Sequence, residues 1–200
     1  ETELALVQIW AFLLKVDADG NGSLSVLSGW VQVDNLQREV LVPEGTRVPE
    51  FEGQPIRLRH VVSHTSGLPA LPPGVAIVDA NDPYAPVDAA MLLAALERST
   101  LKAAPGTAFE YSNFASMLLS HAVARRAGSD FETLLDEQLF TPLGMQGAYV
   151  NRRPEGIRAA TGHLPNRQPT PAWNFKTDVA GVGGVRATLD DMVRYVQGQL

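Results

Sequence analysis

The sequence has no cysteine among its 200 residues. This absence excludes disulfide bonds and metal sites built from thiolates, although it does not fix a cellular compartment. Long apolar runs are also missing, because the apolar stretch at residues 4–14 is well short of the roughly 20 residues that a membrane-spanning helix needs. The same stretch follows acidic residues and has neither a basic segment nor a small-residue cleavage site, so we do not expect a signal peptide there.

Basic patches are scarce as well. The chain has 16 Lys and Arg against 22 Asp and Glu, a net charge of -6, and its arginine pairs at residues 125–126 and 152–153 are isolated. Proteins that track nucleic-acid phosphates concentrate positive charge, so this pattern argues against a nucleic-acid partner. Apolar residues make up 45% of the sequence, enough for a sizeable core and unlike a disordered chain. The length suits one domain or part of a larger one.

The periodicity predicts a helix-rich chain. We expect helices at residues 87–98, 113–127 and 129–139, and a last helix capped by Thr188. The run Ser129-Asp130-Phe131-Glu132 has the form of a capping box. Residues 3–15 fit a buried helix, or a helix leading into a strand near residues 11–16, and residues 24–33 favour extended structure. Both ends of the chain look interrupted, which indicates a partial domain. Residues 69–86 carry five prolines and form a long loop of the kind that is often functional.

The tripeptide Tyr111-Ser112-Asn113 is the clearest chemical landmark. It lies between a short extended segment and a helix start, where side chains are exposed and free N–H groups favour anions. Next to a lysine ammonium, Tyr111 could act as a base or a proton relay. Asn113 could donate an amide N–H to a substrate carbonyl. The plainer interpretation is that Ser112 or Asn113 caps the helix and that Tyr111 belongs to the core.

Four motifs occur in a fixed order and give this tripeptide more weight. Residues 55–69 read PIRLRHVVSHTSGLP, residues 105–113 read PGTAFEYSN, residues 140–145 read FTPLGM and residues 180–192 read AGVGGVRATLDDM. From about residue 42 to residue 200 the sequence resembles serine hydrolases of the beta-lactamase and penicillin-binding-protein type. The class C-like carboxypeptidase and esterase branch is the most similar. Residues 1–41 receive no clear assignment.

The resemblance implies an α+β fold, with an antiparallel sheet flanked by helices, of which this chain would hold mainly the helical region and the loops around the site. It also implies hydrolysis of an amide, peptide or ester acyl group through an acyl-enzyme, without a cofactor or a metal. Tyr111 would be catalytic and Asn113 would bind the substrate. A member like its family would be periplasmic or secreted. The residue pattern specifies no oligomeric state.

The sequence departs from the family at the nucleophile. The family places a Ser-x-x-Lys before the His-Thr-Ser-Gly-Leu-Pro motif, and no such element precedes it here. Residues 99–102 read STLK and fit the bare pattern, but they follow that motif, so we interpret Ser99 and Lys102 as a coincidence at a helix end. The family's last motif, a Lys or His-x-Gly strand, would lie beyond residue 200. We therefore expect an incomplete catalytic set in this chain.

Two other patterns invite chemical interpretations. Ser66 follows His64, but it lacks a Gly-x-Ser-x-Gly elbow, and a structural turn is the favoured interpretation. His60 and His64 have the i, i+4 spacing of metal pairs, but no Glu or Cys completes a zinc signature. Residues 17–25 match the first nine positions of an EF-hand loop, yet Ser28 stands where a bidentate Glu is needed. Calcium binding at residues 17–28 and a catalytically inactive, ligand-binding family member both remain as alternatives.

Overall fold

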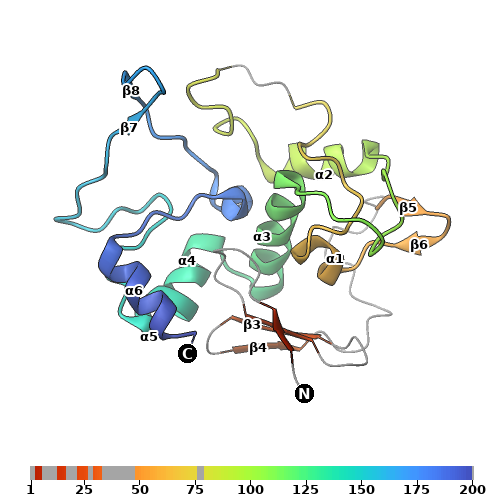
Figure 1. Cartoon of the computed structure of the whole chain (residues 1–200), viewed down its shortest axis with the longest axis horizontal. Coiled ribbons are helices and arrows are strands. Elements are labelled where there is room, and N and C mark those ends of the chain that lie inside the picture. Colours follow the sequence, from red (N-terminus) through yellow and green to blue (C-terminus); the bar gives the residue numbers. More distant parts are fainter. Residues whose placement is uncertain are drawn as a thin grey trace.

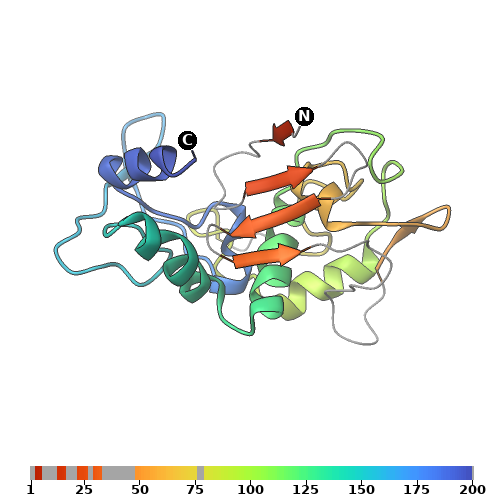
Figure 2. The same cartoon turned by 90° about the horizontal axis from the view of Figure 1, so that it is seen from below.

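The computed structural model describes residues 48–75 and 79–199, together with the backbone of four strands near the N-terminus. These strands are β1 (Glu3–Ala5), β2 (Leu13–Val16), β3 (Gly22–Val26) and β4 (Gly29–Gln32). They form one antiparallel sheet in the order β1-β2-β3-β4. The sheet lies at the bottom of the view in Figure 1 and faces the viewer in Figure 2. The helix expected at residues 3–15 is therefore wrong where the backbone is described. The strand expected near residues 11–16 and the extended structure in residues 24–33 are confirmed there.

The pairing of β2 with β3 argues against calcium binding at residues 17–28. Val16 pairs with Gly22 and Lys15 pairs with Ser23, so β2 and β3 form an antiparallel hairpin. An EF-hand needs a helix on each side of its loop. The candidate ligands Asp17, Asp19 and Asn21 lie outside the described residues, but strands take the place of the helices that would position them.

The remaining described part contains helices joined by turns and loops. They are α1 (Leu58–Val62), α2 (Ala89–Arg98), α3 (Asn113–Ala127), α4 (Phe131–Leu135), α5 (Thr141–Leu143) and α6 (Leu189–Gln197), with a π-helical turn η1 (Asp136–Phe140) and a 3-10 turn η2 (Thr177–Val182). Two short hairpins, β5 (Glu50–Phe51) with β6 (Gln54–Pro55) and β7 (Gly162–His163) with β8 (Pro169–Thr170), project from the helical region (Figure 1). None of the helices within the described ranges has the length and apolar character that a bilayer crossing requires.

Helix α3 is the centre of the core. Its side chains Phe114 and Met117 are fully buried, and burying such a side chain stabilises the fold by about 1.5–3 kcal/mol. Its N-cap is Ser112, whose hydroxyl accepts from the N–H of Ala115. Its C-cap is Gly128, which has the left-handed conformation. Both ends agree with the sequence prediction, because the capping residue and the terminating glycine are local signals.

Turn η2 packs closely against α3. The hydroxyl of Ser120 accepts from the N–H of Gly181 at 3.0 Å and lies 2.9 Å from the carbonyl oxygen of Asp178. A Cβ atom at Gly181 would lie 2.3 Å from the carbonyl oxygen of Ser116, so only glycine permits this approach. The glycine-rich motif at residues 180–192 therefore serves helix packing at its first glycine.

The expected capping box at residues 129–132 is wrong in detail. Asp130, one residue later than Ser129, is the N-cap of α4 and accepts from the N–H of Thr133 at 3.1 Å. Glu132 turns away from the helix start and enters a tertiary contact described below. At the C-terminal side, Thr188 caps α6, as predicted, and the structure adds a capping box with Asp191.

Three buried histidines make the stability of this region sensitive to acid. Burial lowers the pKa of His60 from 6.5 to about 4, and the positive charges of Arg59 and Arg57 act in the same direction. Burial is also the main cause that lowers the pKa of His64 and of His121. The unfolded chain takes up these protons below about pH 6.5, whereas the folded protein resists protonation. The free energy of unfolding should therefore fall as the pH drops from about 6.5 toward 4, and these groups should have no effect above that window.

His121 offers a direct test of this pH dependence. Within the described part of the chain its two ring nitrogens are buried and neither has a hydrogen-bond partner. Replacing an unsatisfied polar side chain by an apolar one of similar size is neutral or stabilising. We expect His121→Leu to keep or raise the Tm of the full-length protein and to reduce the loss of Tm between pH 7 and pH 5. His163→Leu, the same change at an exposed histidine of β7, is the control. A larger acid sensitivity in His121→Leu would contradict the prediction.

Candidate active site

Two of the four motifs lie side by side. Residues 64–70 run along residues 102–114, and backbone hydrogen bonds join Lys102 N to Gly67 O, Gly106 N to Thr65 O, Glu110 N to His64 O and Phe114 N to Ala70 O, at 2.7–3.2 Å. Gly67 has a positive φ of 75°, and a Cβ there would lie 2.3 Å from the carbonyl oxygen of Ala103. Glycine is therefore required at this contact. The His-Thr-Ser-Gly-Leu-Pro motif acts as the support on which the Tyr-Ser-Asn segment rests.

Neither serine of these two segments is placed as a nucleophile. Ser112 is fully buried, and its hydroxyl donates to the carbonyl oxygen of Pro69 at 2.7 Å while it caps α3. Ser66 is buried as well, and its hydroxyl accepts from the N–H of Leu68 at 3.3 Å. Each hydroxyl thus stabilises backbone, which agrees with the interpretation of Ser66 as part of a structural turn.

Tyr111 is exposed to solvent rather than buried. Its exposed fraction is 43%, so the interpretation as a core residue is wrong, and the helix cap is Ser112 and not Asn113. The ring of Tyr111 lies against the imidazole of His64, with 4.5 Å between ring centroids and 36° between the planes. One face of the tyrosine is therefore held by the protein while the side chain remains accessible.

His64 is itself held in place by the motif it supports. Its Nδ1 accepts from the backbone N–H of Ser112 at 3.2 Å, so the neutral ring carries its proton on Nε2. Burial, which lowers its pKa, favours the same neutral state. The backbone of His64 has a positive φ of 55°, a conformation that is uncommon outside glycine and asparagine. His64 thus holds the ring of Tyr111 in place, whereas the sequence patterns had offered it as a partner of Ser66 or as a metal ligand. Among the described residues no group of three or more His, Cys, Asp or Glu side chains could hold a metal.

Asn113 connects the helix start to the long proline-rich loop. Its Nδ2 donates to the hydroxyl of Tyr84 at 3.2 Å. The ring of Tyr84 stacks on Phe175 with centroids 5.3 Å apart and meets Trp173 edge-on at 5.6 Å. The loop and residues 172–176 therefore form an aromatic wall beside Asn113, which no sequence pattern had indicated.

The serine and lysine at residues 99–102 do not form a catalytic pair. The hydroxyl of Ser99 donates to the carbonyl oxygen of Ala95 at 2.8 Å, at the end of α2. Lys102 forms an ion pair with Glu110 on the surface. Because each group is engaged with a different partner, this arrangement agrees with the interpretation of the pattern as a coincidence.

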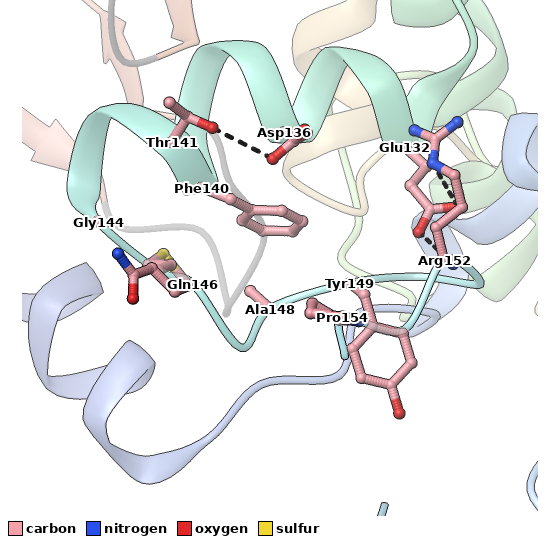
Figure 3. A pocket seen from close by; sticks show the side chains of 11 residues that line it. Glu132, Asp136, Phe140, Thr141, Gly144, Gln146, Ala148, Tyr149, Arg152 and Pro154 are labelled. Carbon is pink, nitrogen blue, oxygen red and sulfur yellow. Dashed lines mark hydrogen bonds and ion pairs between the residues drawn. The ribbon is translucent and has the colours of Figure 1, made fainter. Parts of the chain in front are cut away.

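A separate cavity of about 320 Å³ lies between α4–α5 and residues 144–154 (Figure 3). Glu132 stands at one end, where its Oε1 accepts from the N–H groups of Val150, Asn151 and Arg152 at 2.7–2.9 Å. The side chain of Arg152 lies 3.7 Å from the other carboxylate oxygen. Neither Tyr111 nor Asn113 lines this cavity, so Glu132 serves the loop and not the candidate active site.

The fold and motifs can be compared with known proteins. The beta-lactamase family model matches residues 29–200. The chain is 36% identical to D-alanyl-D-alanine-carboxypeptidase/endopeptidase AmpH of Escherichia coli strain K12 over 79% of its own length and 40% of that protein. It is 33% identical to the D-aminopeptidase of Gluconobacter oxydans over 48% of this chain and 19% of that protein. It thus spans about two-fifths of the length of its Escherichia coli relative.

Solved structures give the same result for the fold. A beta-lactamase/D-alanine carboxypeptidase from Yersinia pestis superposes with a TM-score of 0.63 and 30% identity, over 78% of this chain and 43% of that one. A class C beta-lactamase gives a TM-score of 0.59 and 27% identity, over 72% of this chain and 38% of that one. The expected α+β fold is therefore confirmed. Since the family model covers most of the chain and the four motifs keep the family's order, the chain belongs to the beta-lactamase family.

Proposed function

We propose that the full-length protein containing this chain is a serine hydrolase that acts on amide, peptide or ester acyl groups through an acyl-enzyme. Relatives described as a carboxypeptidase/endopeptidase and as a D-aminopeptidase support peptide-like substrates. The observation that carries the proposal is the presentation of Tyr111, whose accessible ring is fixed by His64 at the start of α3. A purely structural tyrosine would not need to be both exposed and held.

Tyr111 has the role of proton transfer. When the serine attacks the acyl carbon, its proton must leave, and a positioned side chain that accepts it contributes about 10²–10⁴-fold to the rate. Later the same hydroxyl returns a proton to the leaving group. A lysine ammonium beside the phenol would favour the charged form of the tyrosine. The nucleophile and this lysine would come from outside the described ranges.

Asn113 has the role of binding the substrate. Its amide can donate one N–H to a substrate carbonyl while the other stays on Tyr84. This fixed hydrogen bond limits the rotation of the side chain, so less conformational entropy is lost when a substrate binds. Its place in the first turn of α3 puts it two residues from Tyr111.

A second candidate is binding of acyl-peptide ligands without turnover. It is favoured by the serines described above, because Ser66, Ser99 and Ser112 are all engaged with backbone groups. In both candidate functions the ligand binds beside Tyr111 and Asn113. The two functions differ in whether a covalent intermediate forms.

Covalent labelling separates these two candidates. The full-length protein should gain the mass of one fluorophosphonate or penicillin-type probe in intact mass spectrometry, and peptide mapping should place it on a serine outside the described ranges. The chain of residues 1–200 alone should gain no adduct. Folded full-length protein that stays unlabelled would support binding without turnover, and an adduct on Ser66, Ser99 or Ser112 would overturn our assignment.

A further inference from the structure

A second cleft, of about 630 Å³, lies beside the aromatic wall. Its lining includes Arg153, Lys176 and Arg186 and no acidic side chain. This concentration of positive charge stands out in a chain whose net charge is -6. We call this site the basic cleft. Its volume is in the range of pockets that bind small ligands.

The positive charge of the basic cleft is only partly neutralised. Arg186 donates to the carbonyl oxygens of Val150 and Trp173 and lies over the ring of Tyr149, contacts that hold the guanidinium without cancelling its charge. Arg153 is exposed, and within residues 48–75 and 79–199 no carboxylate lies within ion-pair distance of it. Of the three cations only Lys176 has an acidic partner there, Asp88 at 3.3 Å.

The walls of the cleft are tied together. The Nδ2 of Asn151 donates to the carbonyl oxygen of Phe175 at 2.8 Å. Asn174 donates through its backbone N–H and its Nδ2 to the carboxylate of Asp82 at 2.8 and 2.6 Å. These bonds join the proline-rich loop to residues 172–176 and to the segment that carries Arg153. The cleft is therefore formed before a ligand arrives, which lowers the entropy lost on binding.

The cleft adjoins the candidate active site through two aromatic rings. Phe175 lines the cleft and stacks on Tyr84, and the hydroxyl of Tyr84 accepts from Asn113. A substrate held at Asn113 therefore has the cleft next to it across this wall. Trp173, which is 45% exposed, provides an apolar surface at the same edge.

We infer that the basic cleft is the subsite for a carboxylate-bearing arm of the acyl substrate, so that the enzyme prefers acidic peptides to neutral ones. This inference rests on the proposed hydrolase function. Guanidinium groups bind carboxylates with paired hydrogen bonds, and Arg153 and Arg186 present two such groups from different segments. Because the cleft is open to solvent, the preference depends on salt.

Matched substrates test the inference in the full-length protein. Two chromogenic peptide amides that differ only in a glutamyl or a glutaminyl residue next to the scissile acyl group are compared. Several partly exposed ion pairs together should give the glutamyl peptide an advantage of about 10-fold in kcat/KM, expressed mainly in KM. The advantage should fall toward unity at about 1 M salt, where the Debye length is about 3 Å.

Variants assign the effect to the cleft. Arg153→Gln should reduce the glutamyl advantage by about two- to five-fold, through a loss that falls mainly on the glutamyl peptide. Arg125→Gln, the same change at an exposed arginine of α3 that does not line the cleft, should leave the advantage intact. An equal loss on both peptides would indicate a structural role and overturn the inference.

Direct binding separates failure of the inference from failure of the proposed function. Calorimetry measures the Kd of analogues of the two peptides in which an uncleavable bond replaces the scissile one. If both peptides are hydrolysed with equal kcat/KM and bind with equal Kd, the carboxylate preference of the basic cleft is overturned and the proposed hydrolase function stands. If the glutamyl peptide binds more tightly, this difference depends on Arg153, and neither amide is hydrolysed, the carboxylate preference of the basic cleft stands and the proposed hydrolase function is overturned. A glutamyl preference that survives in Arg153→Glu would also overturn the inference.

Discussion

Full-length protein carrying Tyr111→Phe should lose about 10²–10⁴-fold in kcat/KM for acyl transfer, the range expected when a general acid–base group is removed. The substitution deletes one hydroxyl and keeps the ring that packs on His64 at 4.5 Å. The loss should appear in kcat, because the hydroxyl moves a proton only when the acyl bond is being made or broken. Steady-state kinetics on a chromogenic amide or ester, together with the rate of probe labelling, measures it.

Tyr84→Phe is the matched comparison for this prediction. It also removes a phenol hydroxyl, but that hydroxyl only accepts from Asn113. Loss of one such hydrogen bond weakens the orientation of the amide and should cost about 10-fold at most. Both variants should keep a Tm close to that of the parent. Near-normal turnover by a folded Tyr111→Phe protein would refute the proton-transfer role.

Glu132→Ala should lower the free energy of unfolding by about 2–4 kcal/mol, because it removes a buried acceptor that three backbone donors share. The carboxylate is buried in α4 and accepts from the N–H groups of Val150, Asn151 and Arg152. Alanine leaves the buried N–H of Val150 without an acceptor, which costs about 1–3 kcal/mol, and the partly buried N–H groups of Asn151 and Arg152 add to the loss. Urea unfolding of the full-length protein, followed by circular dichroism, measures the change.

Glu132→Gln separates the hydrogen bonds from the charge. The amide oxygen of glutamine can accept from the same N–H groups, while the charge opposite Arg152 is lost. Its destabilisation should therefore lie well below that of Glu132→Ala. Glu137→Ala, at an exposed carboxylate in the following turn, should stay within about 0.5 kcal/mol of the parent. A Glu132→Ala protein as stable as this control would contradict the role assigned to the carboxylate.

The contact at Glu132 also shows why local patterns fail at particular residues. Ser129 and Glu132 have the spacing of a capping box, and that pattern depends on neighbours within one turn. The structure places the N-cap of α4 one residue later, at Asp130, and Glu132 meets the demand of residues 150–152 for a buried acceptor. Such a demand comes from a segment about twenty residues away, so no pattern within a single turn can reveal it.

For this protein, the sequence by itself determined the features that depend on near neighbours. These are the helix at residues 113–127, the last helix with its cap Thr188, and the family, which the order of four short motifs indicates. The candidates Tyr111 and Asn113 also came from a local tripeptide, and their catalytic and substrate-binding roles stay predictions.

Only the tertiary structure decided which distant groups surround those candidates. The support of Tyr111 by His64, the bond from Asn113 to Tyr84 and the gathering of Arg153, Lys176 and Arg186 in one cleft each join segments far apart in the chain. The strand at residues 3–5 also needed it, since an apolar stretch suits a buried helix and a buried strand equally well until a partner strand is present. Pairing and packing between remote residues have no local signature, because their energy exists only once the chain has folded.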